Sequence, residues 1–179
     1  ILEREVPPTE KNIETSKKGQ YRIKDNFLAF WFRFVYPMRS FIESDHPEIA
    51  MTKLKTGFIP NHVGYVYEDI CRQKMWELNA QGKLPFLFDR VGRWWGGKDT
   101  EIDIVAIDTT DRSKIIFGEC KFHQNVPMQL SELHQLKEKA AVVPWGNANR
   151  DEYFALFCIS GYSEDLQQLA QEDSHLLLM

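Results

Sequence analysis

The sequence has few cysteines and no long apolar run, and both shortages narrow the class of protein. Its three cysteines, Cys71, Cys120 and Cys158, are odd in number and widely spaced. They therefore fit neither a disulfide framework nor a paired-cysteine metal site, which favours a reducing setting. No apolar run approaches the roughly 18 residues that a membrane-spanning helix needs. We therefore expect a soluble, cytoplasmic protein with no membrane partner.

An initiator methionine, a signal peptide and a phosphate-binding loop are also missing. The chain begins Ile-Leu-Glu-Arg-Glu, without the basic and apolar regions of a secretion signal. We therefore expect a piece of a longer protein. No Gly-x-x-x-x-Gly-Lys-Ser/Thr pattern occurs, so ATP binding of that type is not expected in these residues.

The bulk composition fits one ordinary globular core. The chain has 179 residues and is 43% apolar, which is enough to bury such a core and a small additional unit. A formal charge of −4 argues against a protein that binds polyanions over its whole surface, because that affinity comes mainly from clustered Lys and Arg. Basic residues do gather within 11–24 and 83–98, so local basic surfaces are expected.

Residues 1–25 alternate in polarity on both sides of a basic loop, which predicts a β-hairpin. A two-stranded hairpin is barely stable alone. It is either the wing of a truncated winged helix or a hairpin that packs on its own protein, and the sequence leaves both open.

A helical linker is predicted for residues 26–60. Asp25 is a suitable N-cap for a helix over 26–36 that is apolar nearly all round, and Pro37 is expected to end it. Shorter helices are predicted at 38–43 and 48–55. The break at 57–60 predicts a boundary, with Asn61 capping the next helix.

Residues 61–179 predict one α/β domain with a mixed sheet flanked by helices. The expected elements are a helix at 61–79, strands at 84–91, 101–108 and 114–122, a helix at 130–143, a strand at 152–159 and a helix at 164–172.

Two neighbouring strands of this domain carry the residues that indicate chemistry. Asp103 lies in an apolar strand, and Glu119 and Lys121 lie two residues apart on the next one, so they share a face. If the strands pair through the turn at 108–114, Asp103 and Glu119 are neighbours. Two such carboxylates repel unless a cation lies between them, and oxygen ligands suit Mg²⁺ or Mn²⁺. Lys121 is then placed to orient a water or help to deprotonate it, or to stabilise charge that grows on a phosphate.

Glu68, in the preceding helix, is a fourth candidate for this site. It is also placed to form an ion pair with Arg72, four residues later, as a surface bridge. A Glu-x-Lys triplet by itself arises readily by chance. Asp103 in an apolar strand is harder to explain without a site, because Asp is depleted in strands and costly to bury unpaired.

The order of these residues resembles the PD-(D/E)XK nuclease superfamily, whose fold is restriction-endonuclease-like. The resemblance covers 61–159 and implies a core of one helix, three strands, a helix and a strand. It implies that Asp103 and Glu119 bind the metal, that Lys121 is the catalytic lysine and that Glu68 is the acid of the helix.

A narrower resemblance covers nearly the whole chain. Residues 21–35, YRIKDNFLAFWFRFV, and 92–97, GRWWGG, are similar to the C-terminal region of archaeal-type P-loop ATPases. That resemblance implies an N-terminal ATPase module, a winged helix and then this nuclease-like domain. Any ATP site would then belong to the ATPase module, which is also the implied partner.

A loop is predicted around residues 93–98, where aromatic, basic and glycine residues mix. Such a composition is suited to stacking on bases and contacting phosphates, although tryptophan pairs more often pack in cores. The candidate nucleic-acid contacts are Arg93, Trp94, Trp95, Lys98, Lys17 and Lys18.

These observations lead to a divalent-metal-dependent phosphodiesterase acting on DNA, or with less support on RNA. The alternative is a catalytically silent module that binds nucleic acid or docks to the ATPase part, and a regulatory switch without nucleic acid stays open. The resemblance to nucleases also implies a homodimer, because many enzymes of that fold pair to cut two strands.

Overall fold

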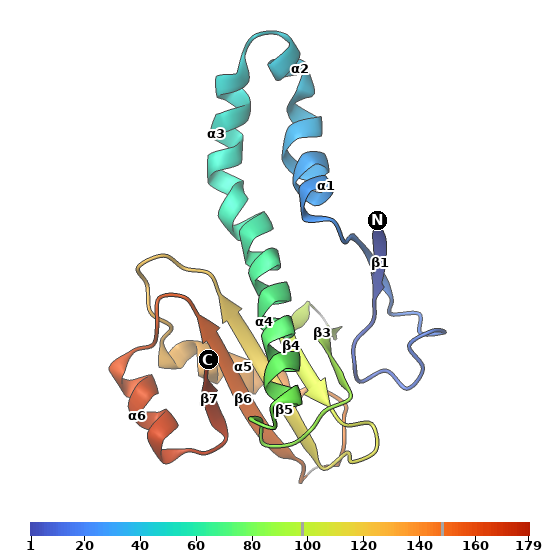
Figure 1. The fold of residues 1–179 in the computed structure, drawn as a ribbon, viewed down its shortest axis with the longest axis vertical. Coiled ribbons are helices and arrows are strands. Elements are labelled where there is room, and N and C mark those ends of the chain that lie inside the picture. Colours follow the sequence, from blue (N-terminus) through green and yellow to red (C-terminus); the bar gives the residue numbers. More distant parts are fainter. Residues whose placement is uncertain (98, 148) are drawn as a thin grey trace.

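The computed structural model describes residues 1–97, 99–147 and 149–179, and it consists of a sheet-containing body, a hairpin and a long helical arm (Figure 1). The body has a five-stranded sheet in the order β3-β4-β5-β6-β7. Pairing is antiparallel from β3 to β5 and parallel from β5 to β7, so the expected mixed sheet is confirmed. The strands are β3 Arg90–Gly96, β4 Thr100–Ile107, β5 Lys114–Lys121, β6 Asp151–Cys158 and β7 Leu176–Leu178.

Helices cover both faces of this sheet. They are α4 Gly64–Ala80, α5 Leu130–Ala141 and α6 Glu164–Glu172. Side chains alternate along a strand, so Ile104 packs with Met75 of α4, while Val105 packs on the opposite face with Leu136 of α5 and Leu166 of α6. The predicted α/β layers therefore follow from strands that are apolar on both faces.

The helical arm differs from its prediction in two places. Pro37 does not end the first helix, and the expected break at 57–60 is wrong: helical structure runs without interruption from Pro47 to Ala80. Pro60 lies in a π-helical segment within this continuous helix, and Asn61 lies inside the same segment instead of capping a helix. The arm elements are α1 Asn26–Phe30, η1 Trp31–Val35, η2 Tyr36–Met38, α2 Arg39–Glu43, α3 Pro47–Phe58 and η3 Ile59–Val63.

The expected cap at the start of the arm is confirmed, since Asp25 accepts a hydrogen bond from the Leu28 N–H at 2.8 Å. Across the described ranges, none of the helices is both long and apolar enough to cross a membrane.

The predicted N-terminal hairpin is confirmed as β1 Leu2–Glu5 paired antiparallel with β2 Gln20–Ile23. It packs against the body: Arg90 donates to the carbonyl oxygen of Glu10 at 2.9 Å, and the Trp94 indole donates to the Thr9 hydroxyl at 3.0 Å. Pro7 and Pro8 are buried in this contact. The hairpin therefore packs on its own protein, and its role as a wing stays a prediction.

The first strand of the sheet was predicted six residues too early. Residues 84–89 are irregular, and β3 instead spans Arg90–Gly96, which was expected to contain a loop. Its glycines serve close packing: a Cβ at Gly92 would lie 3.2 Å from Pro8, and one at Gly96 would lie 2.7 Å from the Trp94 ring. Gly92 and Gly96 are required by packing, so the prediction that they belong to a turn was wrong.

Candidate functional site

The register of β4 and β5 brings the two strand carboxylates together. Ile104 pairs with Gly118, so Asp103 and Glu119 are the next residues along, just beyond the last pair of the ladder. Asp103 Oδ2 accepts the Cys120 backbone N–H at 2.8 Å, which holds its side chain at this end of the ladder. The expected juxtaposition of Asp103 and Glu119 is confirmed.

Glu119 is the most buried charged residue of the site, at 5% exposed. Its Oε1 lies 2.6 Å from the Lys121 ammonium, and its Oε2 lies 3.2 Å from the Lys139 ammonium. The Lys121 contact follows from strand periodicity. Lys139 was not predicted, because it comes from the last turn of α5, and only the packing of that helix on the sheet places it there.

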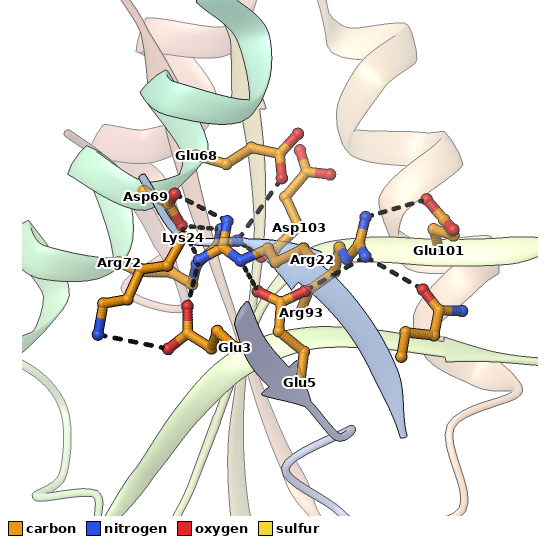
Figure 2. Close-up of polar contacts among 11 residues, drawn as sticks. Glu3, Glu5, Arg22, Lys24, Glu68, Asp69, Arg72, Arg93, Glu101 and Asp103 are labelled. Atoms are coloured by element: carbon orange, nitrogen blue, oxygen red, sulfur yellow. Dashed lines mark hydrogen bonds and ion pairs between the residues drawn. The ribbon is translucent and has the colours of Figure 1, made fainter. Parts of the chain in front are cut away.

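Glu68 approaches Asp103 from α4, and Figure 2 shows their carboxyl groups directed toward each other. Burial, and then the charge of Asp103, raise the pKa of Glu68 to about 7. Burial, and then the charge of Glu119, raise the pKa of Asp103 to about 6. Both carboxyls therefore titrate near neutral pH, as is typical of carboxyls that share a water-poor site.

Arg72 also contacts this site. It lies 3.6 Å from Glu68, as the ion-pair alternative anticipated, and donates to the Asp103 backbone oxygen at 2.9 Å. The two side chains of the pair are only 12% and 16% exposed, so this is not a surface bridge. The ion pair and the carboxyl cluster are parts of one arrangement.

Lys121 stays positively charged. Burial works against its ammonium, but the neighbouring Glu119 carboxylate, with help from Asp103, outweighs burial and raises the Lys121 pKa. The group is therefore suited to stabilising negative charge and poorly suited to removing a proton from water.

An ion network ties the hairpin to the same helix (Figure 2). Arg22 of β2 donates two hydrogen bonds to Asp69, at 2.8 and 2.9 Å, and Arg72 donates to the same carboxylate at 2.6 Å. Burial alone would raise the pKa of Asp69, but the two guanidinium groups lower it. None of this was predicted, because 47 residues separate Arg22 from Asp69.

The donor atoms available to a cation are carboxylate oxygens. Within the described ranges, no group of three or more His, Cys, Asp or Glu is arranged to hold a metal ion. Mg²⁺ often takes only one or two carboxylates and completes its shell with water and substrate phosphate. Mg²⁺ binding of this kind is compatible with the carboxylates of Asp103 and Glu119, which have Glu68 beside them.

Of the predicted nucleic-acid contacts that the structure describes, Arg93, Trp94 and Trp95 lie in β3, and Lys17 and Lys18 lie in the hairpin loop. They differ in access. Trp94 is only 3% exposed, so its ring cannot stack on a base in this structure. The Trp95 indole donates to the Lys18 carbonyl oxygen at 3.2 Å, and Arg93 lies over the Trp95 ring. Lys17 is exposed. Lys98 lies outside the described residues.

Arg93 and Lys18 are also engaged within the chain. Arg93 forms an ion pair with Glu5 at 3.3 Å, and Lys18 forms one with Glu10 at 2.7 Å. Nucleic-acid binding by this group therefore stays a prediction.

The chain is thus a mixed α/β protein with a cluster of buried and half-buried acids and half-buried lysines at one end of two central strands. It belongs to a family described as archaeal and bacterial proteins of unknown function (DUF234), which matches residues 31–140. It is also similar to an uncharacterized protein of Methanocaldococcus jannaschii, 35% identical over 157 residues. The match covers 87% of this chain but only 34% of the relative, so the chain spans about a third of that protein's length. No solved structure matches the chain.

Proposed function

We propose that the chain is a divalent-metal-dependent phosphodiesterase domain with a restriction-endonuclease-like fold, acting on DNA. The observation that carries this proposal is the placement of Asp103 and of Glu119 with Lys121 on adjacent strands, with Glu68 facing Asp103 from α4. Acids that titrate near neutrality, gathered beside a charged lysine, are more typical of a catalytic site than of a structural ion pair.

Asp103 and Glu119 would hold Mg²⁺ or Mn²⁺, which supplies Lewis-acid polarisation of a phosphate oxygen and lowers the pKa of a bound water. The residues of the chain supply the rest. Lys121, held as an ammonium, stabilises the charge that grows on the phosphate. Glu68, with a pKa of about 7, can hold or release a proton near neutral pH, which is the range in which a general acid or base works best.

We further propose that this domain belongs to a multidomain P-loop ATPase and works with its ATPase module. Two facts support this. Residues 21–35 and 92–97 resemble that class, and the region of the M. jannaschii relative that matches this chain makes up only about a third of the relative's length. ATP would bind in the other part of such a protein.

A catalytically silent module that binds nucleic acid or docks to the ATPase part is the second candidate. One observation favours it: each oxygen of Glu119 already contacts an ammonium group, from Lys121 and from Lys139. The two lysines provide the positive charge that a metal ion would otherwise provide.

Calorimetric titration with Mn²⁺ separates the two candidates. We expect wild-type protein to bind the ion, Asp103→Asn to lose most of the binding heat, and Glu172→Gln, an exposed acid at the end of α6, to match wild type. In the same preparations, DNA is offered both as plasmid and as single strands, and cleavage is expected in wild type on at least one of them and lost in Lys121→Met. Circular dichroism checks that each variant is folded.

The nuclease proposal fails if wild-type protein neither binds Mn²⁺ nor cleaves DNA, with or without DNA present during the titration. DNA binding without metal binding or cleavage would support the silent module instead. Cleavage that survives both Asp103→Asn and Lys121→Met would indicate a contaminating enzyme or another site.

A further inference from the structure

A cavity of about 570 Å³ adjoins the candidate site. Its walls come from the hairpin, from the first helices of the arm, from η3 and α4, and from β3 and β4. Glu68 is part of its lining, and the same carboxyl group faces Asp103. A molecule bound in the cavity would therefore reach the acids of the candidate site directly.

Aromatic side chains line the part of the cavity between the arm and α4. Phe32 and Tyr65 both line this cavity, and their side chains are 51% and 41% exposed. His62 also lines it, and burial together with the charge of Arg33 lowers its pKa, which favours the uncharged ring. Arg33 lies over one face of the Tyr65 ring, 5.8 Å from its centroid. Exposed aromatic rings beside a guanidinium form surfaces on which nucleic-acid bases stack.

Arginines and acids both line the cavity, and one of the arginines is placed to bind a phosphate near the aromatic rings. Arg22, Arg72 and Arg93 are all engaged by carboxylates. Arg33, in contrast, has no carboxylate within ion-pair distance anywhere in residues 1–97, 99–147 and 149–179. Its polar contact is a long 3.4 Å hydrogen bond to the Asn61 side chain. A guanidinium without a carboxylate partner is well suited to bind a phosphate group.

The size of the cavity limits the ligand. Its volume of about 570 Å³ lies within the roughly 300–1,000 Å³ typical of small-molecule pockets. One unpaired nucleotide fits such a space, whereas a base that is still paired in a duplex carries its partner strand with it. Enzymes that act on a buried base extrude it or use single strands for the same reason.

We propose that this cavity receives an unpaired nucleotide of a nucleic-acid strand, with its base against Phe32 and Tyr65 and a phosphate at Arg33. The inference rests on the proposed function for its chemistry and adds the substrate class. The strand that reaches Glu68 is single-stranded or has a frayed end, and an intact duplex is not a substrate at this site.

Binding measured without metal tests this directly. A labelled oligothymidylate of about ten nucleotides is titrated with the full chain in EDTA, and fluorescence anisotropy gives the Kd. We expect Tyr65→Ala and Arg33→Ala each to raise the Kd at least about fivefold, as the loss of one stacked base or one phosphate contact predicts. Tyr65→Phe keeps the ring and is expected to retain wild-type affinity.

Two control variants are matched by residue type and lie outside the cavity lining. Tyr21→Ala in β2 and Arg39→Ala in the arm remove an exposed tyrosine and an exposed arginine, and both are expected to leave the Kd unchanged. A blunt duplex with the same number of nucleotides is expected to compete poorly for the labelled strand.

The inference is overturned if wild-type protein does not bind the single strand, if the duplex competes equally well, or if the control variants weaken binding as much as the cavity variants. Because EDTA is present, a failure of cleavage does not affect this result. Single-strand binding through Tyr65 and Arg33 without any metal-dependent cleavage would refute the nuclease and leave the cavity assignment intact. Cleavage that is unaffected by either cavity variant would refute the cavity assignment and leave the nuclease proposal intact.

Discussion

Replacing Glu68 by glutamine should make the protein more stable at alkaline pH. The pKa of about 7, against an ordinary value of 4.5, means that the folded state holds this proton more tightly than the unfolded state. Stability from this group is therefore fully present below about pH 4.5 and declines as the pH rises to about 7 and beyond. Glu68→Gln removes this dependence, because glutamine is uncharged at every pH.

The size of the effect follows from the raised pKa. At about 1.4 kcal/mol per pH unit, the difference between about 7 and 4.5 amounts to about 3 kcal/mol. About 2 kcal/mol of this loss of stability develops between roughly pH 5.5 and pH 8, because at pH 5.5 the carboxyl is still mostly protonated in the folded state. Glu68→Gln should therefore exceed wild type at about pH 8 by up to about 3 kcal/mol and show a flatter pH profile.

Urea unfolding followed by tryptophan fluorescence, at these two pH values and without divalent cations, measures both quantities. Glu172→Gln serves as the control, because it removes an exposed carboxyl outside the site, and it should follow wild type. A Glu68→Gln protein that is less stable than wild type at the higher pH, or that keeps the wild-type slope, would refute the argument from burial and repulsion.

Three further predictions concern the fold. Gly118→Ala should destabilise by about 1–3 kcal/mol, because a Cβ there would lie 2.8 Å from the Ile104 side chain. Gly64→Ala should be neutral or stabilising by up to about 1 kcal/mol, because a Cβ there would make only an ordinary contact, 3.6 Å from the Ile59 carbonyl oxygen; urea unfolding compares the two variants. Arg22→Ala removes both hydrogen bonds to Asp69, so limited trypsin digestion should cut the hairpin loop faster than in wild type; an unchanged cutting rate would show that the network does not hold the hairpin. Leu136→Ala, at a fully buried position, should cost about 2–5 kcal/mol by urea unfolding, and a cost under about 1 kcal/mol would contradict its place in the core.

Several features of the fold could be predicted because they depend on local pattern. The hairpin, the Asp25 cap and the central strands follow from alternation of polarity and from short polar turns. The helix break at 57–60 and the loop over residues 93–96 were predicted wrongly for a shared reason. Glycine and proline usually mark turns, but here Pro60 fits in a π-helical turn and Gly96 makes room for the Trp94 ring.

The candidate site likewise contains some contacts that local pattern predicts and others that it does not. The meeting of Asp103, Glu119 and Lys121 could be predicted from local pattern, because strand side chains alternate with a period of two and a short turn fixes the antiparallel register. The contact of Lys139 with Glu119, the approach of Glu68 to Asp103 and the cavity beside them became visible only in the folded chain. Those relations depend on how α4, α5 and the hairpin pack on the sheet. Packing is set by the shapes of side chains that are distant in sequence, which no local periodicity records.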